Sequence, residues 1–234
     1  MNEIRPQFVT AIVPAFNEAT TIGPILDVLI TCPLVAEIIV VDDGSQDQTA
    51  DIARAKGLLV IKHSQNQGKA EAMKTGINAT TNNIFLFVDA DITGLTNRHL
   101  ERIISPVLKG RYDMYIGIRR RRVYWLNRIL HILPLIAGER VITRTLWESV
   151  PEKYKKGFQI EIALNYFAKI NHHRMSRTLL AGIRHLTKEK KRGFCRGFLA
   201  RWQMNSQIVF ISLRLYVFDR LIRLLSSKEK RQPQ

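Results

Sequence analysis

The first half of the chain alternates between short apolar runs and longer segments with helical spacing. Four apolar runs, rich in β-branched and aromatic residues, are typical of buried strands; they cover residues 8–13, 38–41, 58–61 and 84–88. Helices are expected between them, ending near residues 29, 56 and 79. Short connections of this kind predict a mostly parallel sheet with right-handed crossovers. We therefore expect an α/β fold whose central sheet is flanked by helices.

The second half departs from this alternation. A fifth strand is expected at residues 113–118, an amphipathic helix around residues 160–167 and a late strand at residues 179–183. Residues 197–226 read as one long amphipathic helix. No internal repeat or Gly/Ser linker interrupts the chain, so we expect one structural unit, with residues 1–193 as the main domain and residues 194–234 as its C-terminal helix and basic tail.

Net charge narrows the range of partners. The chain has 36 Lys and Arg against 20 Asp and Glu, a formal net charge of +16, which favours anionic partners. No helix-turn-helix or aromatic-basic RNA-binding signature stands out, so we expect no nucleic acid partner. Two cysteines are too few for a disulfide framework, and the first residues lack a signal-peptide pattern. These observations predict a cytoplasmic protein.

The fourth apolar run ends in two carboxylates, Asp89 and Asp91, separated by Ala90. In an open parallel sheet, ligands bind beyond the carboxyl ends of the strands. Carboxylates this close repel each other unless a cation lies between them. Mg²⁺ or Mn²⁺ suits an all-oxygen site that also binds phosphates. The alternative, and the default for an isolated Asp-x-Asp, is a solvated turn.

Polar or small residues also follow the other predicted strands, at residues 14–18, 41–49 and 66–70. Together with Asp89-Ala90-Asp91, their order, spacing and strand context resemble the family 2 glycosyltransferases of the GT-A fold. The resemblance covers roughly the first half of the chain. Within that family, the basic and compact layout is most similar to the dolichyl- or polyprenyl-phosphate sugar synthases.

The resemblance implies a nucleotide-diphosphate sugar, a UDP- or GDP-sugar, as donor. Pro14, Phe16 and Glu18 would line the nucleotide pocket, with Glu18 accepting hydrogen bonds from the ribose or base. Asp43 would accept from a base N–H, although Asp42 and Asp43 could instead be turn and helix-capping residues. Lys69 would approach phosphate, with a solvated lysine at a helix start as the alternative.

The resemblance also implies the chemistry. Asp89 and Asp91 would hold Mg²⁺ or Mn²⁺ on the diphosphate, with Ala90 lining the substrate site and Asp91 essential for catalysis. The anomeric centre would be inverted by direct displacement, without a covalent enzyme intermediate. His185, after the predicted late strand, is a third candidate metal ligand, because some GT-A enzymes use a late histidine, although a lone histidine more often has another role.

The resemblance further implies acceptor residues around the segment Gly138-Glu139-Arg140, because a Gly-x-Arg segment of this kind borders the acceptor and diphosphate in the family. Arg140 is the first choice for a phosphate contact and Arg119 the second. Glu139 is a candidate catalytic base; a hydroxyl acceptor would need one, whereas a phosphate acceptor is already an anion. The segment at residues 157–161, which contains Gln159, resembles another segment of the family that lies near the acceptor. Glu161, in the same segment, could equally be a charge on a helix surface.

Two segments predict contact with a membrane. Four arginines, at residues 119–122, precede residues 123–133, whose apolar side chains share a broad helical face. Residues 208–225 have an apolar arc wider than one docking face requires, so it would meet lipid or form the seam of a homodimer. No stretch of 18 apolar residues predicts a span. We expect peripheral binding to the anionic cytoplasmic face of the membrane.

These features together predict a metal-dependent, inverting glycosyltransferase that acts on a polyprenyl- or dolichyl-phosphate-type lipid acceptor. The alternative is the same chemistry on a hydroxyl of a glycolipid or soluble molecule, with Glu139 as base. A third interpretation, from another class, is a basic membrane or nucleic-acid-binding protein that has lost catalysis. The presence of Asp43, Lys69, Asp89 and Asp91 argues against it.

Overall fold

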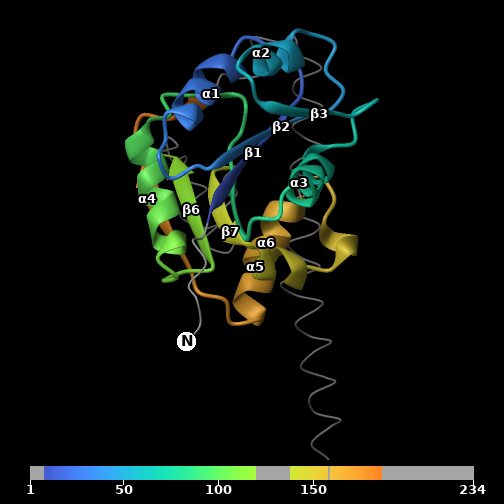
Figure 1. The fold of residues 1–234 in the computed structure, drawn as a ribbon. Coiled ribbons are helices and arrows are strands. Elements are labelled where there is room, and N and C mark those ends of the chain that lie inside the picture. The colour runs from blue at the N-terminus through green and yellow to red at the C-terminus, as the bar shows by residue number, and fades with distance from the viewer. Residues whose placement is uncertain (1–7, 120–137, 158, 186–234) are drawn as a thin grey trace, which may run out of the picture.

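The computed structural model describes residues 8–119, 138–157 and 159–185 (Figure 1). The strands are β1 (Val9–Ala15), β2 (Glu37–Asp42), β3 (Leu59–Lys62), β4 (Ile84–Phe87), β5 (Ile92–Thr93), β6 (Met114–Arg119), β7 (Arg140–Thr143), β8 (Met175–Leu180) and β9 (Arg184–His185). The α-helices are α1 (Ile22–Ile30), α2 (Thr49–Ala55), α3 (Lys69–Asn78), α4 (Asn97–Leu108), α5 (Arg144–Ser149) and α6 (Gln159–Ile170), with a short 3₁₀ turn, η2 (Glu152–Tyr154).

Seven of these strands form one sheet in the order β3-β2-β1-β4-β7-β6-β8, and β5 pairs separately with β9. The pairs β1–β2, β1–β4, β2–β3 and β6–β8 are parallel. Only β7, among the described strands of this sheet, runs antiparallel to its neighbours, β4 and β6. The prediction of a mostly parallel central sheet is confirmed.

Helices cover both faces of the sheet. Apolar residues of α1, α2 and α4 pack on one face, and those of α3, α5 and α6 pack on the other (Figure 1). Strand β4 packs against helices on both faces of the sheet. Phe85 and Phe87 lie on the side of α3, α5 and α6, and Ile84 and Leu86 lie on the side of α1, α2 and α4. All four side chains are at most 1% exposed, as expected for a strand buried on both faces.

Two of the expected elements differ in the structure. The prediction of a strand at residues 179–183 is wrong, because β8 ends at Leu180 and a turn through Ala181 and Gly182 follows before β9. Gly182 has a φ of +91°, a conformation that breaks a strand and favours glycine. The helix that ends near residue 56, which the sequence places from residue 46 onward, begins only at Thr49, because the preceding residues form the turn described below.

The predicted helices at residues 123–133 and 197–226 lie outside the described residues. Within the described ranges, none of the helices combines the length and the apolar character of a membrane span.

Candidate active site

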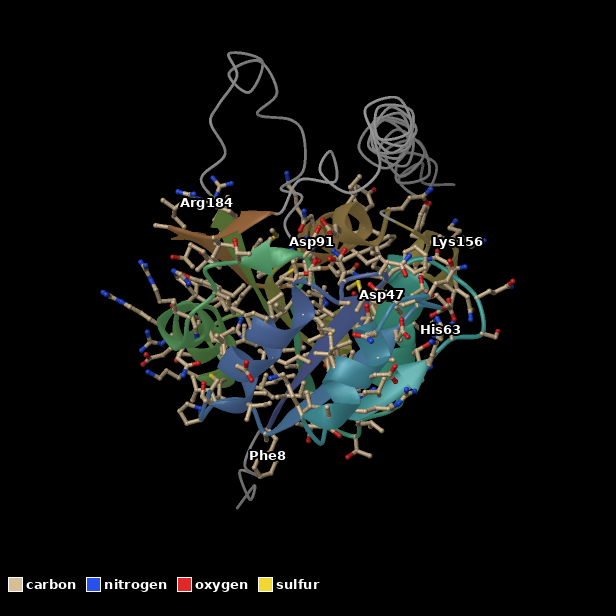
Figure 2. The ribbon with its side chains drawn as sticks, turned by 90° about the horizontal axis from the view of Figure 1, so that it is seen from above. Phe8, Asp47, His63, Asp91, Lys156 and Arg184 are labelled. Atoms are coloured by element: carbon tan, nitrogen blue, oxygen red, sulfur yellow. The ribbon has the colours of Figure 1, made fainter. Side chains whose placement is uncertain are left out.

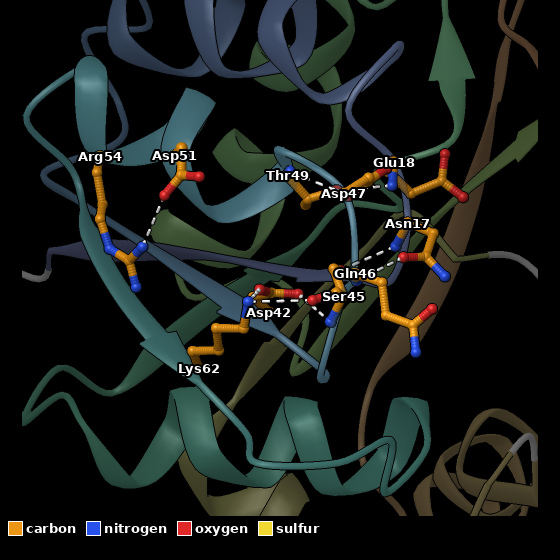
Figure 3. A network of polar contacts seen from close by, with 10 residues as sticks. All are labelled: Asn17, Glu18, Asp42, Ser45, Gln46, Asp47, Thr49, Asp51, Arg54 and Lys62. Carbon is orange, nitrogen blue, oxygen red and sulfur yellow. Dashed lines mark hydrogen bonds and ion pairs between the residues drawn. The ribbon is translucent and has the colours of Figure 1, made fainter.

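The ends of β1 and β2 are joined by a network of hydrogen bonds (Figure 3). The Asn17 N–H donates to Ser45 Oγ at 2.9 Å, and the Gln46 N–H donates to Asn17 Oδ1 at 2.9 Å. The Glu18 N–H donates to Thr49 Oγ1 at 2.8 Å. Asn17 has a φ of +55°, a left-handed conformation that asparagine tolerates. The network therefore brings together residues 14–18 and 41–49, two of the segments predicted to form one site.

Two aspartates in this region have structural partners. Asp42 is fully buried, accepts the Ser45 N–H at 3.0 Å and lies 3.5 Å from Lys62 Nζ. Asp47 accepts backbone N–H groups of Thr49 at 3.0 Å and Ala19 at 3.1 Å. Burial alone would raise the pKa of Asp47, but a hydrogen bond from the Thr49 hydroxyl, together with the backbone hydrogen bonds, outweighs it and lowers the pKa. Asp42 and Asp47 thus shape the turn before α2.

Asp43 anchors the loop that leads to Lys69. Its carboxylate accepts the N–H groups of Gln67 and Gly68, both at 2.8 Å, and lies 2.7 Å from His63 Nδ1. Gly44 permits the close approach of this loop: it has a φ of +79°, and a Cβ there would lie 2.8 Å from the carbonyl carbon of Gln65. His63, which the sequence analysis did not single out, is therefore part of this region.

Lys69 begins α3 and bridges two carboxylates from other elements. Its Nζ lies 2.6 Å from Asp89 Oδ1, after β4, and 2.7 Å from Glu161 Oε1, on α6. Burial alone would lower the pKa of Lys69, but the charges of Asp89 and Glu161 outweigh it and raise the pKa. Lys69 is therefore a protonated cation inside the site, paired with two carboxylates, and the alternative of a solvated lysine at a helix start is wrong.

Glu161 also binds Arg140, at the start of β7. Arg140 Nη1 donates to the Glu161 carbonyl at 3.3 Å, and Nη2 lies 3.7 Å from the Glu161 carboxylate. Burial lowers the pKa of Arg140, an effect opposed by the carboxylates of Glu161, Asp89 and Glu139. Glu161 is 3% exposed, so the suggestion that it is a charge on a helix surface is wrong.

Gly138 lies directly against Asp89. A Cβ on Gly138 would be 1.8 Å from Asp89 Oδ2, so only glycine leaves room for this carboxylate. The next residue, Glu139, is fully buried, and its carbonyl accepts the Gly117 N–H at 2.9 Å. The segment Gly138-Glu139-Arg140 thus lies beside the carboxylate of Asp89, while its role in binding the acceptor stays a prediction.

The remaining predicted site residues lie near the same edge. Pro14, Phe16, Asp91 and Gln159 are half-buried, and Ala90 is buried. Figure 2 shows Asp91 on the opposite side of the molecule from Phe8, which precedes β1. His185 pairs through its backbone with Ile92, next to Asp91, and Arg119 ends β6 opposite Leu180. The side chains of His185 and Arg119 lie outside the described parts.

The donor set suits a hard divalent cation, since Asp89 and Asp91 offer carboxylate oxygens at the end of β4. Asp89 already binds one cation, the ammonium group of Lys69. Among the described side chains, no group of three His, Cys, Asp or Glu gathers into a complete metal site. A metal here would therefore take further ligands from a substrate or from groups outside the described side chains, of which His185 is one.

The sequence profile described as Glycosyl transferase family 2 matches residues 10–170 of the chain. The chain belongs to this family. The matched range of family 2 includes the ends of β1, β2 and β4, Lys69 and the whole of α6, whereas His185 lies beyond it.

Curated relatives match part of the chain. An uncharacterized protein of Methanocaldococcus jannaschii is 39% identical over 123 residues, which is 51% of this chain and 49% of that protein. The 4,4'-diaponeurosporenoate glycosyltransferase of Staphylococcus aureus is 36% identical over 101 residues, 41% of this chain and 27% of that protein. The chain thus spans about half the length of the first relative and about a quarter of the second.

Solved structures of similar fold include glucosyl-3-phosphoglycerate synthase from Mycobacterium tuberculosis. Its complex with Mn²⁺, UDP-glucose and phosphoglyceric acid matches with a TM-score of 0.74 and 25% identity, covering 88% of this chain and 79% of that one. Its complex with phosphoglyceric acid alone matches with a TM-score of 0.73 and 26% identity over the same shares. The expected GT-A fold is confirmed. The similarity to polyprenyl-phosphate sugar synthases stays a prediction.

Proposed function

We propose that this family 2 protein is a metal-dependent, inverting glycosyltransferase that uses a nucleotide-diphosphate sugar. The observation that carries the proposal is the charged cluster of Lys69, Asp89, Glu161 and Arg140 at the carboxyl edge of the sheet. Family membership supports it, as does the similarity to a synthase crystallised with Mn²⁺ and UDP-glucose.

The nucleotide would bind over the ends of β1 and β2. Pro14 and Phe16 would supply an apolar wall, and Glu18 would accept from the ribose or base. Glu18 is already oriented, because Thr21 Oγ1 donates to its Oε2 at 2.7 Å. Asp43, which fixes the loop before Lys69, would accept from a base N–H. A base bound there would be either uracil or guanine.

The diphosphate would lie between the end of β4 and two cations, the half-buried Lys69 and the buried Arg140. Asp89 and Asp91 would hold Mg²⁺ or Mn²⁺, which, when bound, neutralises charge on the departing nucleotide diphosphate. Lys69 supplies a mobile positive charge on a flexible stem, and Arg140 supplies a rigid donor fork suited to phosphate. The protein residues thus orient the donor for direct displacement at the anomeric carbon.

For the acceptor, we propose a polyprenyl- or dolichyl-phosphate-type lipid. Its phosphate would contact Arg140 and Arg119, with Gln159 nearby, and no base would be needed because the attacking group is already an anion. The complete burial of Glu139 favours this choice over one in which Glu139 must reach an acceptor proton. The basic segment at residues 119–122 and the apolar arc at residues 208–225 would hold the protein on the cytoplasmic face of the membrane.

A hydroxyl acceptor is the second candidate. The similar synthase from M. tuberculosis is named for glucosyl-3-phosphoglycerate and was crystallised with phosphoglyceric acid, not with a lipid phosphate. With such an acceptor, Glu139 would have to act as base after a change in its surroundings.

A thermal-shift panel tests the donor class. UDP and GDP, each with and without Mn²⁺, should raise the apparent Tm of the full chain unequally, because only ligands that bind the folded state stabilise it. The largest shift should require Mn²⁺ together with one of the two nucleotides. If neither nucleotide raises Tm in the presence of Mn²⁺, the proposed function is wrong.

A further inference from the structure

Lys69 occupies a position at Asp89 that a metal ion would also need. Its Nζ lies at charge-assisted hydrogen-bond distance from both Asp89 Oδ1, 2.6 Å, and Glu161 Oε1, 2.7 Å. All three side chains are at most 17% exposed, so solvent screens these contacts only weakly. A divalent ion bound to the same Asp89 oxygen would be repelled by the ammonium group at this distance.

Glu161 holds Lys69 independently of Asp89. Its carboxylate also lies 3.7 Å from Arg140, whose Nη1 is hydrogen-bonded to the Glu161 carbonyl. Glu161 is therefore fixed by a buried strand residue, while Lys69 has a flexible four-carbon stem. If Lys69 leaves Asp89, it can keep its contact with Glu161 and remain beside the site.

We propose that Lys69 acts as an exchangeable cation, held by Glu161, that blocks Asp89 in the free protein and moves to the nucleotide diphosphate when donor and metal bind. The proposal rests on the proposed function and adds a binding order to it. Glu161 is then a positioning residue, since it acts on the substrate only through Lys69 and Arg140.

The exchange predicts that metal and nucleotide strengthen each other's binding. A diphosphate that attracts Lys69 frees Asp89 for the metal, and a metal on Asp89 releases Lys69 toward the diphosphate. Because coupling between two ligands is reciprocal, each should raise the affinity of the other by the same factor. In the free protein, Mn²⁺ should therefore bind weakly.

Mn²⁺ binding by the full chain, measured by electron paramagnetic resonance of the free ion, tests the exchange directly. Without nucleotide, Lys69→Met should bind Mn²⁺ about tenfold more tightly than the wild type, because the competing charge-assisted contact is gone. Glu161→Gln should bind Mn²⁺ more weakly than the wild type. Of the two carboxylates that hold Lys69, only Asp89 then remains, so Lys69 stays on the oxygen that the metal needs. Lys69→Gln is a second variant, in case the methionine variant folds poorly.

Lys74→Met is the matched control. Lys74 lies on the same helix, α3, and carries the same charge, but it pairs with Glu152 at 2.9 Å. Lys74→Met should leave the Mn²⁺ affinity unchanged. If the loss of one positive charge tightened Mn²⁺ binding in general, Lys74→Met would bind Mn²⁺ more tightly, as Lys69→Met does.

The same titration with UDP or GDP present completes the test. Nucleotide should tighten Mn²⁺ binding in the wild type and have much less effect in Lys69→Met. Unchanged or weaker Mn²⁺ binding in both Lys69 variants, with the wild type still showing nucleotide-dependent binding, would overturn the exchange and leave the proposed function standing. If the wild type binds no Mn²⁺ with either nucleotide, the proposed function itself is wrong and the exchange falls with it.

Discussion

Replacing Asp43 with Asn should destabilise the protein and weaken nucleotide binding. Asp43 is 4% exposed, and its two carboxylate oxygens accept the N–H groups of Gln67 and Gly68 and contact His63. Asparagine keeps the shape but loses the negative charge and one acceptor oxygen. At least one of these donors therefore loses its partner or faces an amide NH₂ group.

The size of the effect follows from the surroundings of these donors. A hydrogen bond to a charged group contributes about 1.5–3 kcal/mol, and an unsatisfied buried donor costs about 1–3 kcal/mol. Gln67 is exposed and Gly68 half-buried, so water can replace part of what is lost. We expect the free energy of unfolding to fall by about 2 kcal/mol, which corresponds to a Tm lower by about 4–8 °C in a chain of this size.

Urea unfolding followed by circular dichroism measures this loss. The matched control is Asp51→Asn, since Asp51 is 74% exposed and pairs only with Arg54, three residues later, among its described ion pairs. The control should change the free energy of unfolding by less than about 0.5 kcal/mol. If the Asp43 and Asp51 variants are equally stable, Asp43 does not anchor the loop before Lys69.

Three further predictions concern the acceptor, acid stability and the membrane. With a phosphate acceptor, Arg140→Ala should lower kcat/KM at least about tenfold in folded protein while Glu139→Gln changes it little; the reverse ranking in steady-state transfer assays would favour a hydroxyl acceptor. Burial alone would raise the pKa of Asp113, but the hydrogen bonds and charge of Arg174 lower it. A carboxyl group whose pKa is lower in the folded than in the unfolded protein stabilises the folded state at pH values above its unfolded pKa. This contribution to the free energy of unfolding is lost as the pH falls through the folded pKa. As the pH falls below about 3.8, the free energy of unfolding measured by urea titration should therefore decrease less in Asp113→Asn than in the wild type. Equal decreases in the two proteins would contradict this. Binding to anionic liposomes should weaken in salt without vanishing, and deleting residues 208–234 should release much of the protein, whereas a detergent-free dimer with no vesicle affinity at low salt would refute membrane attachment.

The sheet and the position of two aspartates at its carboxyl edge were predictable because their signals are local. The continuous apolar run at residues 84–88, which contains β4, is followed at once by Asp89-Ala90-Asp91, and the β-strand and α-helix alternation before it implies a parallel sheet. Strand β7 was not predicted. It is only four residues long and begins with Arg140, and its antiparallel position is decided by pairing with β4 and β6, strands distant in sequence.

The partners of the site residues were harder to predict. Glu161 was left open as a surface charge, yet α6 is buried on nearly every side. A helix that is apolar all round is buried, so the apolar residues flanking Glu161 were a signal that its charge has a buried partner. Neither that partner, Lys69, nor the contact between His63 and Asp43 could be read from spacing, because packing of separate elements creates both.

Sugar transfer by the Asp91→Ala variant tests the central claim most directly. Release of nucleoside diphosphate from the donor sugar, in the presence of Mn²⁺ and polyprenyl phosphate, would be compared between this variant and the wild type. Because Asp91 is half-buried at the end of β4, outside the apolar core, circular dichroism should show an unchanged fold. The account predicts a loss of turnover of about 10²-fold or more, as for other groups that stabilise developing charge. Near-normal turnover by the folded variant would contradict the assignment of Asp91 to a catalytic metal site.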